Sequence, residues 1–329
     1  MTRFWKFGVL LVVLGMSSSL WAEPPEKARQ HLVVPSQADL AQDRLEVHFL
    51  DVGQGDSAII RTPDHKTYMV DCGPRGARKK TIPYLKALGV EKLDGIFISH
   101  SHMDHFGSLP YMVDAFPVDA VYFSGHVHTS KYNEKTLIKL KKKKIRMVKL
   151  KQGDKMKLGG GVALSVLSPP EDWNPELVDV NDYSVVLRFS LGDIDFLFMG
   201  DAERRAEQAI LKSKLEIRSE FLKVGHHGSE TSSSELFLDN VLPLFAVISC
   251  GVANKFGHPD AKTIEHLQQR NVTIMRTDEN GTVMVLTDGK KVFIKVKGKS
   301  WTPVSLNEGE RLRLVSIPGA IYGGLQYAC

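Results

Sequence analysis

Residues 96–107 read Ile96-Phe97-Ile98-Ser99-His100-Ser101-His102-Met103-Asp104-His105-Phe106-Gly107. This stretch places three histidines and an aspartate within six residues, directly after an apolar strand. Imidazole and carboxylate groups are the ligands that borderline divalent metals prefer. Because alternate residues of an extended chain point to one side, His100 and His102 can hold one ion, while Asp104 and His105 reach a second. Surface histidines on a loop are the alternative, but twelve histidines in 329 residues rarely cluster so densely.

The sequence on either side of this segment predicts a layered α/β fold. Alternating apolar residues from 45 to 70 indicate three strands of an antiparallel meander. Helices expected near 78–88 and 106–115 then alternate with strands at 95–99 and 118–123. A second round of strands and helices runs from about 162 to 297. Two β-rich halves with flanking helices favour two packed sheets with helices outside.

Four further motifs lie in these two halves. They read Asp51-Val52-Gly53-Gln54-Gly55-Asp56-Ser57, Val70-Asp71-Cys72-Gly73, Phe198-Met199-Gly200-Asp201 and Val224-Gly225-His226-His227-Gly228-Ser229. With His100-x-His102-x-Asp104-His105, they resemble the metallo-β-lactamase superfamily and, more narrowly, the hydrolase domain of ComEC-type competence proteins. The resemblance covers residues 45 to about 297. It implies an αββα sandwich of two mixed β-sheets, with two metal ions at one edge of the sheets.

The resemblance also implies a set of metal ligands. His100 and His102 would hold the first ion, Asp104 and His105 the second, and Asp201 would bridge them. Asp201 follows an apolar strand and a glycine, which suits a ligand; a cap of the helix that follows is the alternative, and both roles can hold at once.

Two other aspartates are expected to support these ligands without binding an ion. Asp71 would orient a ligating histidine from beneath, and such contacts fix the imidazole tautomer. Asp56 could act similarly, or it could simply form a turn after Gly55.

The sequence departs from the superfamily pattern before Asp201, where many members supply another histidine. Asn181 stands in that interval, a substitution that ComEC-type sequences share. His226 or His227 is then expected to complete the first metal site, and His258 to serve the second metal or the substrate; a turn before Pro259 is the alternative for His258. Of these residues, we expect Asp104, His227 and His258 to act in catalysis.

One more histidine pair lies between the main motif and Asp201. His126 and His128 stand in a Ser/Gly/Thr loop, which favours an exposed position over metal binding.

The two ends of the chain differ from its middle. Residues 1–22 carry Arg3 and Lys6 before a short apolar run and end in small residues, which predicts a signal peptide cleaved near Ala22, with an uncleaved anchor as the alternative. Residues 23–44 read as a flexible lead, residues 45–297 as the hydrolase domain, and residues 298–329 as an extension of unknown order. We therefore expect export to the periplasm or medium, with no transmembrane domain in the mature chain.

Charge is only a weak guide to the partners of this protein. The formal charge of +5 falls to +3 without residues 1–22, which does not by itself argue for nucleic acid. Eight lysines and arginines gather between residues 139 and 151, as a solvated helix end or as a phosphate-binding patch. Three cysteines allow at most one disulfide within the chain.

These features favour an exported hydrolase that uses two divalent ions, zinc or manganese, to activate water. A phosphodiester is the expected substrate, with DNA or RNA first because of the ComEC-type resemblance. Cleavage of a smaller ester, such as a phosphocholine ester, is the second hydrolase hypothesis. A non-catalytic binding protein on the same fold is the alternative from a different class.

Overall fold

The structure, a computed structural model, describes residues 43–126 and 129–304. The expected signal peptide, the lead up to residue 42, His128, and residues 305–329 of the expected extension lie outside the described residues.

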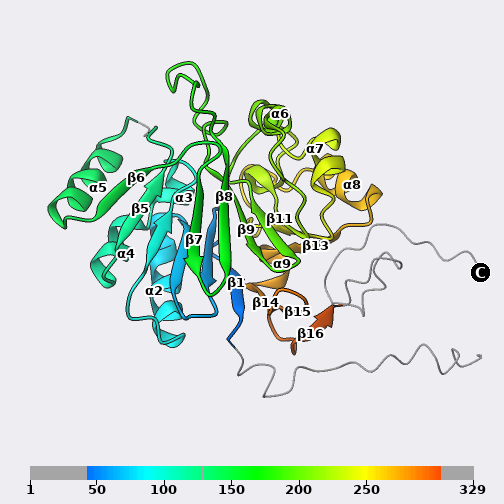
Figure 1. Cartoon of the computed structure of the whole chain (residues 1–329), viewed down its shortest axis with the longest axis horizontal. Coiled ribbons are helices and arrows are strands. Elements are labelled where there is room, and N and C mark those ends of the chain that lie inside the picture. Colours follow the sequence, from blue (N-terminus) through cyan, green and yellow to red (C-terminus); the bar gives the residue numbers. More distant parts are fainter. Residues whose placement is uncertain (1–42, 127–128, 305–329) are drawn as a thin grey trace, which may run out of the picture. The chain divides into compact units, whose positions relative to one another are not determined.

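Two β-sheets form the centre of the fold (Figure 1). The first has the order β16-β15-β14-β1-β2-β3-β4-β5-β6 and the second β13-β12-β11-β10-β9-β8-β7. The strands of the first sheet are β1 Leu45–Phe49, β2 Ser57–Arg61, β3 Thr67–Cys72, β4 Gly95–Phe97, β5 Ala120–Phe123, β6 Arg146–Lys149, β14 Val283–Thr287, β15 Val292–Lys295 and β16 Thr302–Val304. Those of the second are β7 Lys155–Gly159, β8 Val162–Ser168, β9 Val186–Leu191, β10 Ile194–Phe198, β11 Phe221–Lys223, β12 Phe245–Ile248 and β13 Thr273–Arg276.

Helices cover the outer faces of these sheets. They are α2 Arg78–Ala87, α3 Met103–Phe106, α4 Leu109–Ala115, α5 Lys131–Lys142, α6 Arg204–Ser213, α7 Glu235–Val241, α8 Ala261–Gln269 and α9 Thr277–Asn280, with the short 3-10 helices η2 Arg75–Ala77 and η3 Gly225–Gly228. None of the helices in the described ranges combines the length and hydropathy that a membrane span requires.

The first sheet begins as the sequence predicts, because β1, β2 and β3 form an antiparallel meander. From β3 onward the strands run parallel through β4 and β5 to β6, with helices in the connections. β14 pairs with β1, so the two ends of the described chain meet in one sheet. β16 pairs with β15 and lies beyond residue 297, where the sequence suggests that an extension begins, so the sheet includes the start of that segment.

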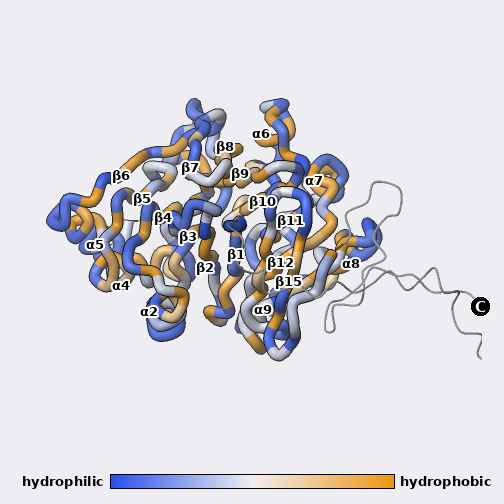
Figure 2. The backbone as a smooth tube through the Cα atoms, turned by 60° about the horizontal axis from the view of Figure 1, so that its bottom comes forward, coloured by the Kyte–Doolittle hydropathy of each residue, from blue (hydrophilic) through white to orange (hydrophobic). Residues whose placement is uncertain are grey.

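Three hydrophobic clusters bind the four layers together. The central one lies between the sheets and includes Phe196, Phe221 and Phe245, whose rings stack across three neighbouring strands at 4.7 and 4.8 Å. A second packs α2, α4 and α5 onto the first sheet, and a third packs α6, α7 and α8 onto the second. Figure 2 shows hydrophobic stretches along the central strands. The predicted αββα sandwich is confirmed.

The arrangement of strands brings several polar loops to one edge of the sandwich. Parallel β3, β4 and β5 all end at this edge, as do β10, β11 and β12 of the second sheet. The antiparallel strand β2 begins there. Loops that converge at strand ends can gather reactive side chains on a rigid scaffold.

The lysine-rich segment 139–151 runs from the last turns of α5 into β6. Lys139 and Lys143 both pair with Asp114, and Lys151 pairs with Glu171. The turn between α5 and β6 precedes the N-terminal end of β6, whereas the converging loops follow the C-terminal ends of its parallel neighbours. This placement fits a solvated helix end better than a patch beside those loops.

Candidate metal centre

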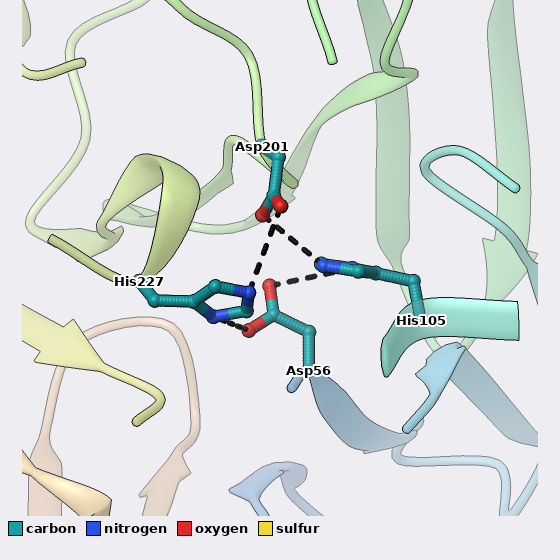
Figure 3. A group of neighbouring side chains, drawn as sticks. All are labelled: Asp56, His105, Asp201 and His227. Atoms are coloured by element: carbon teal, nitrogen blue, oxygen red, sulfur yellow. Dashed lines mark ion pairs between the residues drawn. The ribbon is translucent and has the colours of Figure 1, made fainter. Parts of the chain in front are cut away.

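The predicted ligands lie together at the edge where the strand ends converge. His100, His102, Asp104 and His105 follow β4, and Asp201 follows β10. His227 lies in η3 directly after β11, and Asp56 precedes β2. Figure 3 shows that Asp56, His105, Asp201 and His227 point toward one another from four separate segments. All four side chains are buried.

The first group of donor atoms comes from His100, His102 and Asp201. His100 Nε2 lies 3.0 Å from His102 Nδ1 and 3.7 Å from Asp201 Oδ2. Burial, together with the nearby charge of His105, holds the pKa of His100 well below its usual value. A neutral imidazole is the form that binds a metal ion.

The second group comes from Asp56, His105, Asp201 and His227. His105 Nε2 lies 3.1 Å from Asp201 Oδ1, and His227 Nε2 lies 3.6 Å from Asp201 Oδ2. His227 Nε2 is also 3.2 Å from Oδ2 of Asp104. Asp201 therefore belongs to both groups, which is the position that a bridging ligand requires.

Two contacts set the ring orientation of the histidines in the second group. His105 Nδ1 lies 2.8 Å from Asp71 Oδ2, and Asp71 also accepts hydrogen bonds from the backbone and hydroxyl of Ser99. His227 Nδ1 lies 2.9 Å from the carbonyl oxygen of Ser249. With Nδ1 held in this way, both rings direct Nε2 toward Asp201. Supporting contacts of this kind orient histidine ligands in metal sites. Asp71 has the geometry that the resemblance implied for it.

Asp56 lies on the other side of these rings. Its carboxylate is 3.3 Å from His227 Nδ1 and 3.9 Å from His105 Nδ1, while Lys223 Nζ lies 2.6 Å from Asp56 Oδ2. The side chain of Lys223 is only 3% exposed. Although Asp56 is near enough to join the second group, its ion pair and its place behind the rings favour the supporting role.

Unsatisfied polar atoms indicate that these residues fit a metal ion. His105 Nε2, Asp201 Oδ1 and Asp56 Oδ1 are buried, and although charged groups lie within 3.1–3.3 Å of them, none of these contacts among the described residues has the geometry of a hydrogen bond. Burial lowers the pKa of His227, but Asp201, Asp104 and Asp56 outweigh it and raise that pKa to about 10. Asp201 and Asp71 likewise raise the pKa of His105 against the effect of burial. The cluster thus carries excess negative charge, which a cation would neutralise.

The backbone is strained where it presents these side chains. Asp71, His226 and His227 have φ values of 58°, 46° and 54°, in the left-handed region that L residues rarely adopt. Such conformations cost on the order of 1–3 kcal/mol each and cluster at functional sites.

His226 and His258 lie at the margin of the two donor groups. His226 Nε2 is 3.9 Å from Asp201 Oδ2, and its Nδ1 pairs with Glu203 at 2.9 Å. The rings of His226 and His258 are 5.7 Å apart, and His258 Nδ1 lies 3.4 Å from Asp260. Within the described ranges, neither group of closely spaced donors includes His226 or His258.

This arrangement alters the expected division of labour. The sequence predicts that one of the paired histidines completes the first metal site, but His227 instead joins His105 in the second group and contacts Asp104. Asn181, at the interval where a histidine is sought, lies 3.4 Å from Glu203 through its Nδ2. His126 packs its ring 5.4 Å from that of Tyr183 and belongs to neither group.

Two contributors to the site, Lys223 and Glu203, are not predicted from the sequence. Lys223 could have been suspected, because a lysine in the buried strand Phe221–Lys223 needs an acidic partner. Glu203 gives no such signal. Its link to His226 depends on how η3 packs against the start of α6.

A family model described as the metallo-beta-lactamase superfamily matches residues 50–252. The chain belongs to this superfamily. Its members typically bind divalent metals, and the buried histidines and aspartates of this metallo-β-lactamase-fold hydrolase could hold them.

The curated relatives of the chain include competence proteins. The chain is 29% identical to ComE operon protein 3 of Bacillus subtilis, over 72% of this chain and 32% of that protein. It is 31% identical to competence protein ComA of Neisseria gonorrhoeae, over 71% of this chain and 31% of that one. The chain thus spans about a third of the length of these relatives. The ComEC-type resemblance is confirmed.

Among solved structures, a variant of the CmlA beta-hydroxylase has a TM-score of 0.50 and 13% identity, covering 74% of this chain and 54% of that one. At this identity the likeness shows the fold alone.

Proposed function

We propose that this protein hydrolyses phosphodiesters with two divalent ions, zinc or manganese, and that nucleic acid is its substrate. The observation that carries the proposal is the sharing of Asp201 between two groups of buried donors. When bound, two such ions would lower the pKa of a shared water and stabilise charge on the phosphoryl oxygens.

The residues of this chain divide the remaining work. His100 and His102 would hold the first ion, Asp104, His105 and His227 the second, and Asp201 both. These side chains are fixed before substrate arrives, because Asp71 and the Ser249 carbonyl already orient their rings.

His226 is placed to give a proton to the leaving oxygen. Its Nδ1 is held by Glu203, and its Nε2 faces the site from a side chain that is 24% exposed. Burial lowers the pKa of His226, but the bond to Glu203 and the charge of Asp201 outweigh it and raise that pKa, which favours the protonated ring that a proton donor needs. We therefore assign proton transfer to His226 in place of His227.

His258 would hold a phosphoryl oxygen beside His226. Burial lowers its pKa, which leaves the ring neutral and able to donate a hydrogen bond from one nitrogen. Its Nδ1 is buried and lies 3.4 Å from Asp260 Oδ2, so the donor to the phosphoryl oxygen would be Nε2.

Nucleic acid is favoured by the surface beside His258. Phe256 is 55% exposed, and its ring stacks parallel to that of His258 with centroids 6.0 Å apart. Lys255 Nζ lies 4.9 Å from the centre of the Phe256 ring. An exposed aromatic ring with an adjacent cation can stack a base and contact a phosphate.

A substrate panel tests this proposal. Metal-loaded protein should hydrolyse bis(p-nitrophenyl) phosphate and single-stranded DNA or RNA, and should leave nitrocefin intact. Asp201→Ala is the matched control, because it leaves the surface of the protein unchanged but removes the carboxylate that both donor groups share. Turnover of a phosphocholine ester alone would favour the smaller-ester hypothesis. Inert behaviour toward every substrate, with metal bound, would favour a binding protein.

We also propose that residues 1–22 direct export and are removed, so that the mature protein begins at Glu23. This export signal is supported by the charged start of the chain, by the short apolar run, and by the small residues before the cleavage site. N-terminal sequencing of protein from the periplasm or medium should find Glu23. A membrane-bound product that still begins at Met1 would contradict it.

A further inference from the structure

A pocket of about 400 Å³ opens at the first sheet, and the proposed mechanism does not use it. Its walls come from the loop after β1, from α2, and from the ends of β14 and β15. β1 and β15 both end at the edge that carries the donor groups, since β14 is antiparallel to each. The pocket therefore lies on the same edge as the metal centre.

Lysines give the pocket a positive charge. Lys80, Lys295 and Lys297 line it, against the single carboxylate of Asp51. Lys80 already contacts Asp51, with Nζ 3.3 Å from Oδ2 and 3.1 Å from the carbonyl oxygen. Lys295 and Lys297 are then in excess, and lysine ammonium groups bind phosphate as point charges.

An aromatic ring lies in the same pocket and is held by a buried polar network. Tyr84 lines the pocket, and its hydroxyl lies 2.9 Å from Nδ1 of His48, whose side chain is 1% exposed. His48 Nε2 is 3.1 Å from Glu46, which also pairs with Arg61. The apolar part of the lining includes Val52 and Met284. A fixed aromatic ring in a pocket that also has apolar lining suits the face of a nucleobase.

A short loop connects the pocket to the metal centre. Asp51 lines the pocket, and Asp56, five residues later, contacts His105 and His227. A fully extended chain of that length spans no more than about 18 Å. A few nucleotides of a single strand could therefore reach from the donor groups to the pocket.

We propose that this pocket binds one nucleotide of the substrate strand away from the cleaved bond, with its phosphate at Lys295 and Lys297 and its base against Tyr84. The proposal rests on the phosphodiesterase function. It extends that function by giving the enzyme a means to prefer a strand over a small diester.

Binding of a phosphorothioate oligothymidine, which resists hydrolysis, to the metal-loaded protein tests the proposal by fluorescence anisotropy. The double variant K295S/K297S should bind it at least about tenfold more weakly, and its salt dependence should fall by roughly 0.7 in log–log slope for each lost phosphate contact. K290S/K291S is the matched control. It removes two exposed lysines at the opposite end of the same β-hairpin and should bind within about twofold of wild type.

Tyr84 is tested with a pair of variants. Y84A should weaken binding by about five- to 150-fold, because stacking on an aromatic ring is lost, whereas Y84F keeps the ring and most of the affinity. Equal binding by Y84A and wild type would show that no base stacks on Tyr84 in this pocket.

Two results would overturn the proposal as a whole. One is an unchanged oligothymidine affinity in K295S/K297S. The other is a K295S/K297S variant that loses binding of thymidine monophosphate but keeps its affinity for oligothymidine, which would assign the pocket to a free nucleotide. Hydrolysis of bis(p-nitrophenyl) phosphate by wild type is measured in parallel. Its absence would reject the proposed function while leaving the binding result to be judged separately.

Discussion

Replacing Lys223 with methionine should strongly destabilise the metal-free protein. Lys223 Nζ lies 2.6 Å from Asp56 Oδ2, and both side chains are at most 7% exposed. Burial acts to raise the pKa of Asp56, but Lys223 outweighs it and keeps that pKa below its usual value. Without Lys223, the buried carboxylate loses its nearest cation, and only the rings of His227 and His105 still face it, at 3.3 and 3.9 Å.

The size of the effect follows from this burial. Removing one partner of a buried ion pair costs about 3–5 kcal/mol, which is a large part of a typical unfolding free energy of about 5–15 kcal/mol. Urea unfolding of chelator-treated Lys223→Met should show this loss. Lys212→Met, which alters an exposed lysine of α6, should stay within about 0.5 kcal/mol of wild type.

A second variant and a second pH make the prediction specific. Asp56→Asn combined with Lys223→Met should recover part of the loss, because the carboxylate that lost its lysine partner is then neutral. In wild type, the lowered pKa of Asp56 contributes stability above about pH 4 that is lost as the pH falls. In Lys223→Met the pKa of Asp56 should rise, so the deficit should shrink as the pH falls and Asp56 gains a proton. A deficit below 1 kcal/mol at pH 8, or a double variant no more stable than the single one, would refute this reasoning.

Three further predictions concern the metal centre. Asp201→Ala should lose both ions by elemental analysis, because one carboxylate serves both donor groups; full metal content would reject the shared role. His227→Ala should lower the metal content. His226→Ala and His258→Ala should retain metal and lower turnover by about 10²- to 10⁴-fold, as expected for lost proton transfer or substrate contact. The reverse pattern would exchange the roles of these residues. The pKa of His227 is raised to about 10 and that of His105 is also raised, so a metal ion must compete with protons for these rings, and metal binding should release protons and tighten as the pH rises. Calorimetry in buffers of different ionisation enthalpy measures that release, and an affinity independent of pH would contradict it.

The layers, and the gathering of the main candidate ligands at one edge, could be predicted because their signals are local. An apolar strand directly precedes His100. The spacing of His100, His102 and Asp104 then places these residues together at the end of that strand, whatever the rest of the fold. Asp201 could be predicted for the same reason, since it directly follows β10. The connection of β14 to β1 could not be read from the pattern, because pairing between distant strands leaves no local signal.

The roles of the paired histidines were beyond the sequence for a conformational reason. His226 and His227 are adjacent, and only the left-handed backbone of η3 turns one toward Asp104 and the other toward Glu203. The residue types alone do not predict this left-handed backbone conformation. The position of Asp56 depends similarly on Lys223, which comes from the opposite sheet.

The most direct test of the account is a metal titration of chelator-treated protein, with bound manganese or zinc and hydrolysis of bis(p-nitrophenyl) phosphate measured on the same samples. Hydrolysis should be absent without metal and should rise as the second ion binds, reaching its maximum near two ions per chain. Phosphodiester hydrolysis that persists in the metal-free protein, or a fully loaded protein that cleaves no phosphodiester, would contradict the account.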